Sequence, residues 1–394
     1  MRDSGEVMRR LEFEWRGDRI LRGGWVMSFR LDLCWFPVPC LRLTTQITNN
    51  LRDVCLCAMF DRPTSLPEGR VATLGMLIID HFAVCDEDGR EVPVDEPTLG
   101  GGGLYATVAA RQFLPPANVG FIADVGPDFP ASFRSQLERL GEMVSFRPRD
   151  VTTRALNIYS GARVGYAGEE GTQSFRYLVP RKQITPRDFL PPCPVGGVRW
   201  LHVVCDTQRA GAILDEIQGI GVGWRTAWEP LVRTNADLDE YAALAARFDI
   251  FSPNHLELAT ILGRDDGVEV NAAAFRARCS TPIVVRAGAD GAYALSYEWS
   301  GRVPAFWRDG SRILDVTGGG NAFMGGLLAG LLLTNDMRAG CIYGSTAASF
   351  AIEQRGIPQL STEHGEELWN GDDAWARLKE MARRTELLEI ESSN

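Results

Sequence analysis

Asp315-Val316-Thr317-Gly318-Gly319-Gly320-Asn321 is the stretch that decides how this chain is interpreted. Its three successive glycines stand directly before an apolar helical run that continues to Leu333. Glycine lets a backbone approach a phosphate closely, and the free N–H groups at a helix start carry partial positive charge. The stretch therefore predicts an anion cradle. Transfer of a phosphoryl group at such a cradle calls for a base beside it, and the amide of Asn321 cannot act as one.

The overall composition excludes several other classes of protein. With 394 residues, 45% of them hydrophobic and 23% charged, the chain is typical of a globular protein of one or two domains. A net charge of −10 disfavours a nucleic-acid partner, because such proteins usually present a basic surface. No apolar run reaches the roughly 18 residues of a membrane span. The nine cysteines and four histidines form no zinc spacing, and scattered thiols favour a cytoplasmic location.

The first 70 residues differ from the rest of the chain. They show no sustained period of 2 or 3.6. Their several acidic residues disfavour a mitochondrial transit peptide, and no apolar core follows a basic start as in a secretory signal. We interpret residues 1–70 as an N-terminal extension of unknown role, and disorder or a gene-model artefact remain open as explanations.

From residue 71 onward, short β-forming runs alternate with helical segments. This alternation predicts one α/β domain over residues 71–388, with a largely parallel sheet covered by helices on both faces. Residues 84–97 and 155–179 break the pattern and predict β-hairpins that stand off the main sheet as a lid. The expected strands are 72–79, 119–123, 200–204, 222–228, 248–251, 283–286 and 293–295, and the expected helices are 104–113, 131–140, 209–217, 238–247, 256–262, 321–334, 338–354 and 373–388.

Polar residues at the ends of the predicted strands are candidates for ligand contacts. Asp80 ends the strand that begins at Gly75, and a carboxylate at such a rim can accept hydrogen bonds from two hydroxyl groups. Its alternative role is that of a cap. The glycine run 100–103 precedes a helix and is either a second ligand loop or a flexible connector.

Two later motifs have equally good structural explanations. Asn254 followed three residues later by Glu257 matches a capping box at a helix start. Gly288 and Gly291 lie in a stretch that also fits a hairpin with an Asp-Gly turn.

Taken in order along the chain, these motifs resemble those of the pfkB or ribokinase family of carbohydrate kinases. The likeness covers nearly all of residues 71–360 and implies a ribokinase-like α/β fold with a small β lid. Within the family it is to a fungal branch related to the yeast killer-maintenance proteins, as Trp228-Glu229-Pro230 and residues 318–323 show. In that branch, Asn321 would be a property of the lineage.

The resemblance assigns roles to the acceptor side of the site. It implies that Asp80 grips the acceptor and that Gly101 and Gly102 form the family's double-glycine signature at a helix start. Tyr105 stands where ribokinases have an asparagine that hydrogen-bonds the sugar, which disfavours plain ribose as the acceptor. The family's catalytic aspartate falls on Asn321.

On the nucleotide side, the resemblance implies ATP and Mg²⁺ as cofactors. Asn254 would lie beside the phosphates and Glu257 would order hydrated magnesium, while Gly288 and Gly291 would pass close to the nucleotide. The N–H groups of Gly318, Gly319 and Gly320 would form the anion hole. Thr317 would lie on the same side, and Asp315 would adjoin a site for a monovalent cation, K⁺. Lid strands in the family often pair between subunits, which implies a homodimer.

Two functions remain open on the sequence. The first is an ATP-dependent kinase for a hydroxyl of a sugar-like or nucleoside-like molecule, weakened because Asn321 replaces the base, at a typical cost of about 10²–10⁴-fold. The second is a pseudokinase that binds nucleotide or metabolite as a sensor or partner-binding protein. Neither nucleic acid nor membrane is expected as a partner.

Overall fold

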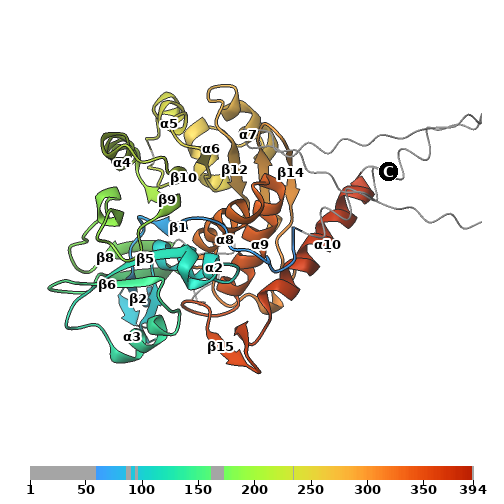
Figure 1. Cartoon of the computed structure of the whole chain (residues 1–394). Coiled ribbons are helices and arrows are strands. Elements are labelled where there is room, and N and C mark those ends of the chain that lie inside the picture. Colours follow the sequence, from blue (N-terminus) through green and yellow to red (C-terminus); the bar gives the residue numbers. More distant parts are fainter. Residues whose placement is uncertain (1–58, 86–89, 94–95, 161–172, 234, 393–394) are drawn as a thin grey trace, which may run out of the picture. The chain divides into compact units, whose positions relative to one another are not determined.

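The computed structural model describes residues 59–85, 90–93, 96–160, 173–233 and 235–392 (Figure 1). The chain divides into two units, residues 1–51 and 52–394, and the described residues all belong to the second. The prediction for residues 1–58 therefore lies outside the described residues. Among the described helices, none is both long and apolar enough to cross a bilayer.

A nine-stranded sheet forms the centre of the second unit, in the order β14-β13-β12-β11-β10-β9-β1-β5-β6. Strands β12 through β6 of this order pair in parallel, and β13 and β14 add antiparallel strands at one edge. The prediction of a largely parallel sheet is confirmed. The strands are β1 (Arg70–Thr73), β5 (Val119–Val125), β6 (Val144–Pro148), β9 (Val198–Cys205), β10 (Arg225–Pro230), β11 (Ile250–Phe251), β12 (Ile283–Arg286), β13 (Ala292–Leu295) and β14 (Ser300–Val303).

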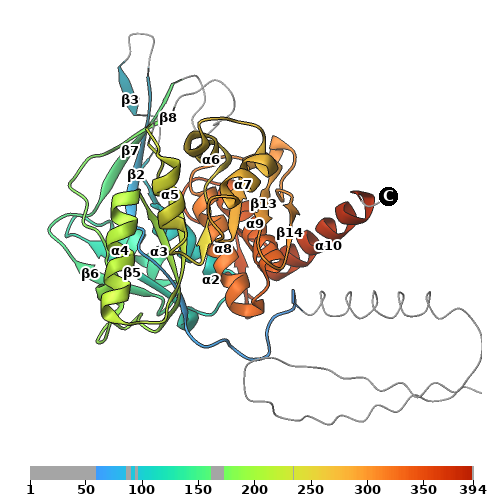
Figure 2. The same cartoon turned by 90° about the horizontal axis from the view of Figure 1, so that it is seen from above.

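Successive residues of the central strands feed two separate hydrophobic cores. In β10, Ala227 enters one core and Trp228 the other, as the period of 2 in a strand requires. Helices α2, α3, α8, α9 and α10 contribute to the first core, and α4, α5, α6 and α7 to the second (Figure 2). Their bounds are α2 (Gly102–Arg111), α3 (Ala131–Glu138), α4 (Thr207–Ile220), α5 (Leu238–Ala245), α6 (His255–Leu262), α7 (Val268–Arg276), α8 (Gly319–Thr334), α9 (Met337–Ile352) and α10 (Ala374–Ser392).

A second sheet has the order β3-β2-β7-β8, with β4 also paired to β2. It consists of β2 (Ile78–Cys85), β3 (Glu91–Pro93), β4 (Thr98–Gly100), β7 (Arg154–Ser160) and β8 (Gln173–Tyr177). The antiparallel pairs β2–β3 and β7–β8 fall largely in the two predicted hairpins, and parallel pairing of β2 with β7 joins them into one sheet. Residues 86–89, 94–95 and 161–172 of those hairpins lie outside the described residues.

The strand expected over residues 72–79 is wrong as a single element. β1 ends at Thr73, whose Oγ1 accepts a hydrogen bond from the N–H of Gly75 at 2.9 Å. The backbone of Gly75 then passes so close to Gly103 that a Cβ at either position would overlap the other residue. The chain therefore leaves the central sheet and enters β2 of the second sheet, which moves Asp80 from a strand end to the interior of a strand.

Residues 59–69, which the sequence analysis places in the extension, pack against the domain. Phe60 is buried, with its ring 6.1 Å from that of Tyr343 in α9, and Tyr343 donates to the carbonyl of Met59 at 2.9 Å. Asn118 donates to the carbonyls of Pro67 and Gly69 at 2.8 Å each. These contacts attach the segment before β1 to the helices that cover the first core.

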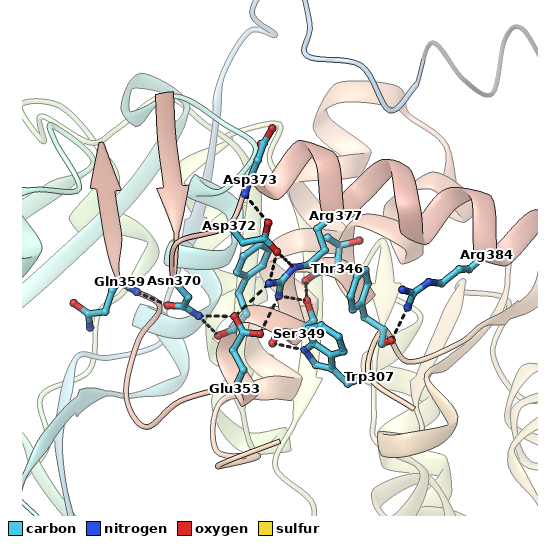
Figure 3. Close-up of polar contacts among 12 residues, drawn as sticks. Trp307, Thr346, Ser349, Glu353, Gln359, Asn370, Asp372, Asp373, Arg377 and Arg384 are labelled. Atoms are coloured by element: carbon cyan, nitrogen blue, oxygen red, sulfur yellow. Dashed lines mark hydrogen bonds and ion pairs between the residues drawn. The ribbon is translucent and has the colours of Figure 1, made fainter. Parts of the chain in front are cut away.

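The C-terminal helix α10 is held by a buried arginine (Figure 3). Arg377 forms ion pairs with Asp372 at 2.7 Å and with Glu353 at 3.2 Å, and its guanidinium lies 3.6 Å from the centre of the Phe350 ring. The N–H of Asp315 in turn donates to the carbonyl of Ile352, at the end of α9. The remaining elements are β15 (Leu360–Glu363), β16 (Glu366–Trp369) and four short 3-10 turns, η1 (Pro116–Asn118), η2 (Pro186–Phe189), η3 (Gly288–Asp290) and η4 (Gly310–Arg312).

Candidate active site

A pocket of about 440 Å³ opens between the two sheets, and both predicted glycine-rich helix starts line it. It brings together the predicted residues Asp80, Gly101, Gly102, Tyr105, Thr317, Gly318 and Asn321. The other predicted residues, Asn254, Glu257, Gly288, Gly291, Asp315, Gly319 and Gly320, are not among the residues that line it. The pocket therefore coincides with the acceptor side of the predicted site.

The glycines at the start of α8 are required by close contacts. Gly318 has φ of 77°, and its Cα packs on the ring of Tyr105, where a Cβ would overlap the ring atoms. A Cβ at Gly320 would overlap Nη1 of Arg286. Within the described residues, the N–H groups of Gly318 and Gly320 have no protein acceptor, whereas the N–H of Gly319 donates to the carbonyl of Val316 at 3.1 Å. The free donors of the cradle are thus those of Gly318 and Gly320.

Asn321 lies in the first turn of α8 and points its amide at a carboxylate. Its Nδ2 donates to Oε2 of Glu229 at 2.9 Å. On its other side it contacts Gly102, where a Cβ would lie 2.9 Å from the same nitrogen. The amide at the predicted base position is therefore fixed between α2 and the end of β10.

Glu229 is a buried carboxylate with three donors. His202 Nε2 lies 2.9 Å from its Oε2, and Arg286 Nη1 donates to its Oε1 at 2.6 Å, in addition to Asn321. Burial alone would raise the pKa of the Glu229 carboxyl, but Arg286, His202 and Asn321 outweigh this effect and lower the pKa to about 2. Glu229 is consequently ionised throughout the neutral range and is a poor proton acceptor.

Arg286 connects this carboxylate to the predicted nucleotide side. Its Nη2 donates to the carbonyl of Ser252 at 3.0 Å and lies 3.4 Å from Oε2 of Glu257. Asn254 and Glu257 form the capping box, with reciprocal bonds of 2.7 and 2.8 Å. Burial raises the pKa of Glu257, and Arg286 opposes that shift. One guanidinium thus bridges the acid next to Asn321 and the acid predicted to order magnesium.

Gly288 and Gly291 lie in the connection between β12 and β13. Gly288 has φ of 57° and faces open space, while Gly291 packs so tightly on the backbone of Val303 and Pro304 that no side chain would fit. The hairpin explanation accounts for Gly291, and the open surface at Gly288 leaves room for a ligand.

Asp80 is buried in the wall of the pocket formed by the second sheet. Asn157 Nδ2 donates to its Oδ1 at 3.3 Å, and Gly100 packs directly on its Oδ2. Burial raises the pKa of Asp80 to about 7, the bonds from Asn157 and Gly101 oppose the shift, and the charge of Asp315 adds to it. Asp80 is therefore a carboxyl group that exchanges its proton near neutral pH.

Asp315 lies just before the cradle with one carboxylate oxygen unpaired. Its Oδ1 accepts the N–H of Thr317 at 2.9 Å, whereas its buried Oδ2 has no partner. An unpartnered buried carboxylate oxygen is costly, and a bound cation would satisfy it. The residue therefore fits the monovalent-cation site that the sequence predicts. Across the described ranges, no three His, Cys, Asp or Glu side chains form a ready metal-binding cluster.

Sequence reasoning missed Glu229, Arg286 and Asn157. Glu229 and Arg286 come at or near the ends of the parallel strands β10 and β12, so the rule that drew attention to Asp80 could have found them. Asn157 lies inside the lid hairpin, where nothing in the pattern distinguishes it. By contrast, Asp124 near the end of β5 and Asp128 just after it are held by structural partners: Asp124 by Arg147 and Arg149, and Asp128 by Thr152 and Arg154.

Comparison with known proteins shows what this arrangement is similar to. Residues 226–363, which include Glu229, Arg286 and the glycine cradle, match the model of the pfkB family of carbohydrate kinases. The likeness to the pfkB family therefore covers the residues that surround Asn321. Protein MAK32 of Saccharomyces cerevisiae is 28% identical over 346 residues, which cover 78% of this chain and 91% of that protein. This is the likeness to a fungal branch that the sequence indicates.

Relatives with other names share the pfkB-family fold. A cytidine kinase of Thermococcus kodakarensis is 25% identical over 266 residues, 65% of this chain and 88% of that protein. The structure of Arabidopsis thaliana ribokinase complexed with ribose and ATP superposes with a TM-score of 0.56 at 13% identity, covering 81% of this chain and 99% of that one. The ribokinase-like fold is confirmed.

Proposed function

We propose that this chain is an ATP-dependent phosphotransferase of the pfkB type that acts on a hydroxyl group of a sugar-like or nucleoside-like small molecule. One observation carries the proposal: Asp80 and Asn321 flank the glycine-rich start of α2, with Gly100 packed on Asp80 and Gly102 packed on Asn321. The acceptor ligand and the family's base position thus lie at one pocket, next to the N-terminus of the 16-residue helix α8. Similarity to a cytidine kinase and to a ribokinase complexed with ribose and ATP supports this class of acceptor.

The described residues supply binding and charge stabilisation for the transfer. A bond forms between the acceptor oxygen and the γ-phosphorus as the bond to ADP breaks, and the hydroxyl loses its proton. Because the transition state is loose, positioning and electrostatics contribute most of the catalysis. The free N–H groups of Gly318 and Gly320, at the positive end of α8, stabilise charge on the transferring group. Asp80 orients the acceptor, and its pKa near neutrality suits it to take the proton.

The cofactors follow from the same geometry. Glu257 Oε2 is used by Asn254 and Arg286, while its Oε1 has no protein partner among the described residues and would hold the water shell of Mg²⁺. Magnesium bound to ATP neutralises charge on the phosphates. Asp315 would bind K⁺ through Oδ2, which would also lessen the effect of its charge on Asp80. A homodimer through the exposed edge strands β3 and β8 of the second sheet belongs to the same proposal.

A second function, that of a pseudokinase, is favoured by the Asn321–Glu229 hydrogen bond. The residue at the base position is a donor already engaged at 2.9 Å, and its partner carboxylate has a pKa near 2. Neither group takes up a proton at neutral pH. If Asp80 only orients the ligand, the domain binds nucleotide and metabolite without efficient transfer.

ATP binding and ADP release distinguish the two functions. Three proteins are compared: wild type, Asn321→Asp, and Asn321→Asp with Glu229→Gln. Calorimetry measures their binding of MgATP, and a coupled assay measures ADP release with a panel of polyols, sugars and nucleosides. A kinase turns over at least one acceptor as wild type, and Asp80→Asn reduces the rate by about 10²-fold or more. The pseudokinase explanation predicts no turnover by wild type and a gain of orders of magnitude in the double variant.

The control for introducing a carboxylate is Asn271→Asp. Asn271 is buried and donates to Asp265 at 3.3 Å, but it lies outside the pocket and should leave turnover unchanged. Failure of wild type and of every variant to bind MgATP would refute both functions.

A further inference from the structure

The pocket carries a second group of polar residues away from Asn321. Arg209 enters it from α4, and Arg181 from the segment that follows β8. Because α4 belongs to the second core and α8 to the first, Arg209 and Asn321 approach the pocket from opposite faces of the central sheet. The pocket thus has a transfer end at α8 and a basic end at α4.

Uncharged groups hold both arginines in place. Arg209 Nη2 donates to the carbonyl of Ile184 at 2.6 Å, and its Nη1 donates to Gln183. The guanidinium of Arg181 lies 5.2 Å from the centre of the Tyr177 ring, in cation–π contact. Throughout the described part of the chain, neither arginine forms an ion pair with a carboxylate. Both guanidinium groups are therefore held by neutral hydrogen-bond and ring partners and not by a paired carboxylate.

The nearest acid in the pocket is already engaged. Asp206 caps α4 by accepting the N–H of Arg209 at 3.1 Å, and its other oxygen pairs with Arg233 at 2.8 Å. Burial lowers the pKa of Arg209, and the charge of Arg181 lowers it further while Asp206 and Glu216 oppose the shift. Both guanidinium groups line the same pocket, and an anion bound between them would offset their mutual repulsion.

From these observations we infer that the acceptor carries an anionic group, a phosphate or a carboxylate, bound by Arg181 and Arg209 at the end of the pocket remote from the transferred phosphoryl group. This inference rests on the proposed function for its transfer end only. The product would then carry two charged groups, the original anion and the new phosphate ester. Guanidinium groups suit both phosphate and carboxylate because their planar donors match either anion.

Matched pairs of ligands test the inference without ATP. Calorimetry compares glucose with glucose 6-phosphate and gluconate, ribose with ribose 5-phosphate, and cytidine with cytidine 5′-monophosphate. We expect the charged member of at least one set to bind about 10- to 100-fold more tightly than its neutral partner, as hydrogen bonds between charged groups allow. Within the glucose set, preference for the 6-phosphate or for gluconate identifies the anion. The preference should weaken with added NaCl, because the site is partly open to solvent.

Two variants and a matched control assign the effect to these arginines. Arg181→Gln should reduce the preference by about tenfold, and Arg209→Lys, which keeps the charge but not the paired donors, should reduce it less. Lys182→Gln removes the same charge from the neighbouring residue, which does not line the pocket, and should leave the preference intact. Equal loss in Lys182→Gln and Arg181→Gln would show a diffuse basic surface and overturn the inference.

The outcomes separate this inference from the proposed function. The anionic acceptor is refuted if no charged ligand binds more tightly than its neutral partner, or if none of the ligands binds. In that case, turnover of a neutral acceptor would still support the kinase function. If a charged ligand binds through Arg181 but wild type neither binds MgATP nor releases ADP, the anion site stands and the kinase function fails.

Discussion

Asn321→Asp gives the sharpest test of the geometry at the base position. The substitution replaces the amide that donates to Glu229 Oε2 at 2.9 Å with a carboxylate. The new carboxylate then faces the buried carboxylate of Glu229, whose ionised form Arg286 and His202 stabilise. The folded protein must either bear the repulsion or bind a proton between the two groups, as paired carboxylates do.

The size of the effect depends on pH. Two charges about 4 Å apart repel by ~4 kcal/mol at an effective dielectric constant of about 20. Protonating one aspartate instead costs ~1.4 kcal/mol for each pH unit above its unfolded pKa of about 3.9, hence ~1.5 kcal/mol at pH 5 and ~5.6 kcal/mol at pH 8. The protein adopts the cheaper state, so the free energy of unfolding should fall by about 1.5 kcal/mol at pH 5 and about 4 kcal/mol at pH 8.

The sign follows from proton linkage. The pKa of the new carboxyl is raised in the folded state, so between about pH 4 and pH 7 the folded protein binds more protons than the unfolded one. Stability relative to wild type therefore falls as pH rises through that window. Adding Glu229→Gln should restore most of the loss at pH 8, because its amide can donate to the new carboxylate.

Urea denaturation at pH 5, 6.5 and 8, with wild type measured alongside, gives the comparison. Asn271→Asp is the matched control: it also sets a carboxylate against an acid, but Asp265 is exposed and the N–H of Asp266 donates to the side-chain oxygen at position 271 at 3.3 Å, so the slope with pH should be shallower. A flat difference between Asn321→Asp and wild type from pH 5 to pH 8 would refute the contact with Glu229. An equal slope in the control would show that the effect is not specific to the site.

Two further substitutions test other parts of the structure. Asp80→Asn should raise the free energy of unfolding at pH 8 by at most ~4 kcal/mol and leave it nearly unchanged at pH 4. The carboxyl has a pKa of about 7 in the folded state and about 3.9 in the unfolded state, so wild type loses stability only as pH rises between these values. Urea titrations at both pH values measure the difference, and a loss of stability at pH 8 would contradict the burial of an ionised Asp80. Phe60→Ala should lower the free energy of unfolding by about 3–5 kcal/mol, because it leaves a cavity at a buried site against Tyr343. Leu66→Ala is the control: its side chain is 59% exposed, so the change should be less than about 0.5 kcal/mol. Equal small effects would show that residues 59–69 do not pack on the domain.

Local sequence pattern was enough to predict a largely parallel α/β sheet. Gly102 and Asn321 begin helices whose starts the glycine runs mark, and both line one pocket, whereas Asp80 lines the same pocket from inside β2 and not from the strand end that the pattern indicates. The pattern also placed most strands and helices near their observed bounds. It did not predict α7 or the strands β6, β14, β15 and β16. It also fused β1 with β2, because the apolar run across residues 72–79 hides the contact of Gly75 with Gly103 that turns the chain.

The chemistry around Asn321 was beyond the reach of the sequence. Whether Asn321 in α8 faces water, substrate or protein depends on Glu229, which lies 92 residues earlier in strand β10. The same holds for Arg286, whose reach to both Glu229 and Glu257 depends on the spacing of neighbouring strands. A pattern shows that a charged residue ends a strand, but only the packed structure shows which charge opposes it.

The attachment of residues 59–69 has a consequence for how this protein folds during synthesis. Asp61 pairs with Lys379 at 2.6 Å, and Arg62 pairs with Glu366 at 2.7 Å across a sequence separation of 304 residues. β1, which follows this segment, lies between β9 and β5 in the middle of the sheet. Among the described strands, β1 is the first to leave the ribosome, and it is paired on both sides only after β9 has been made. The segment ahead of it finds its partners only after nearly the whole domain has been made. Chains interrupted before α9 would leave Phe60 without Tyr343, and such exposed apolar surface is one on which chaperones and proteases act.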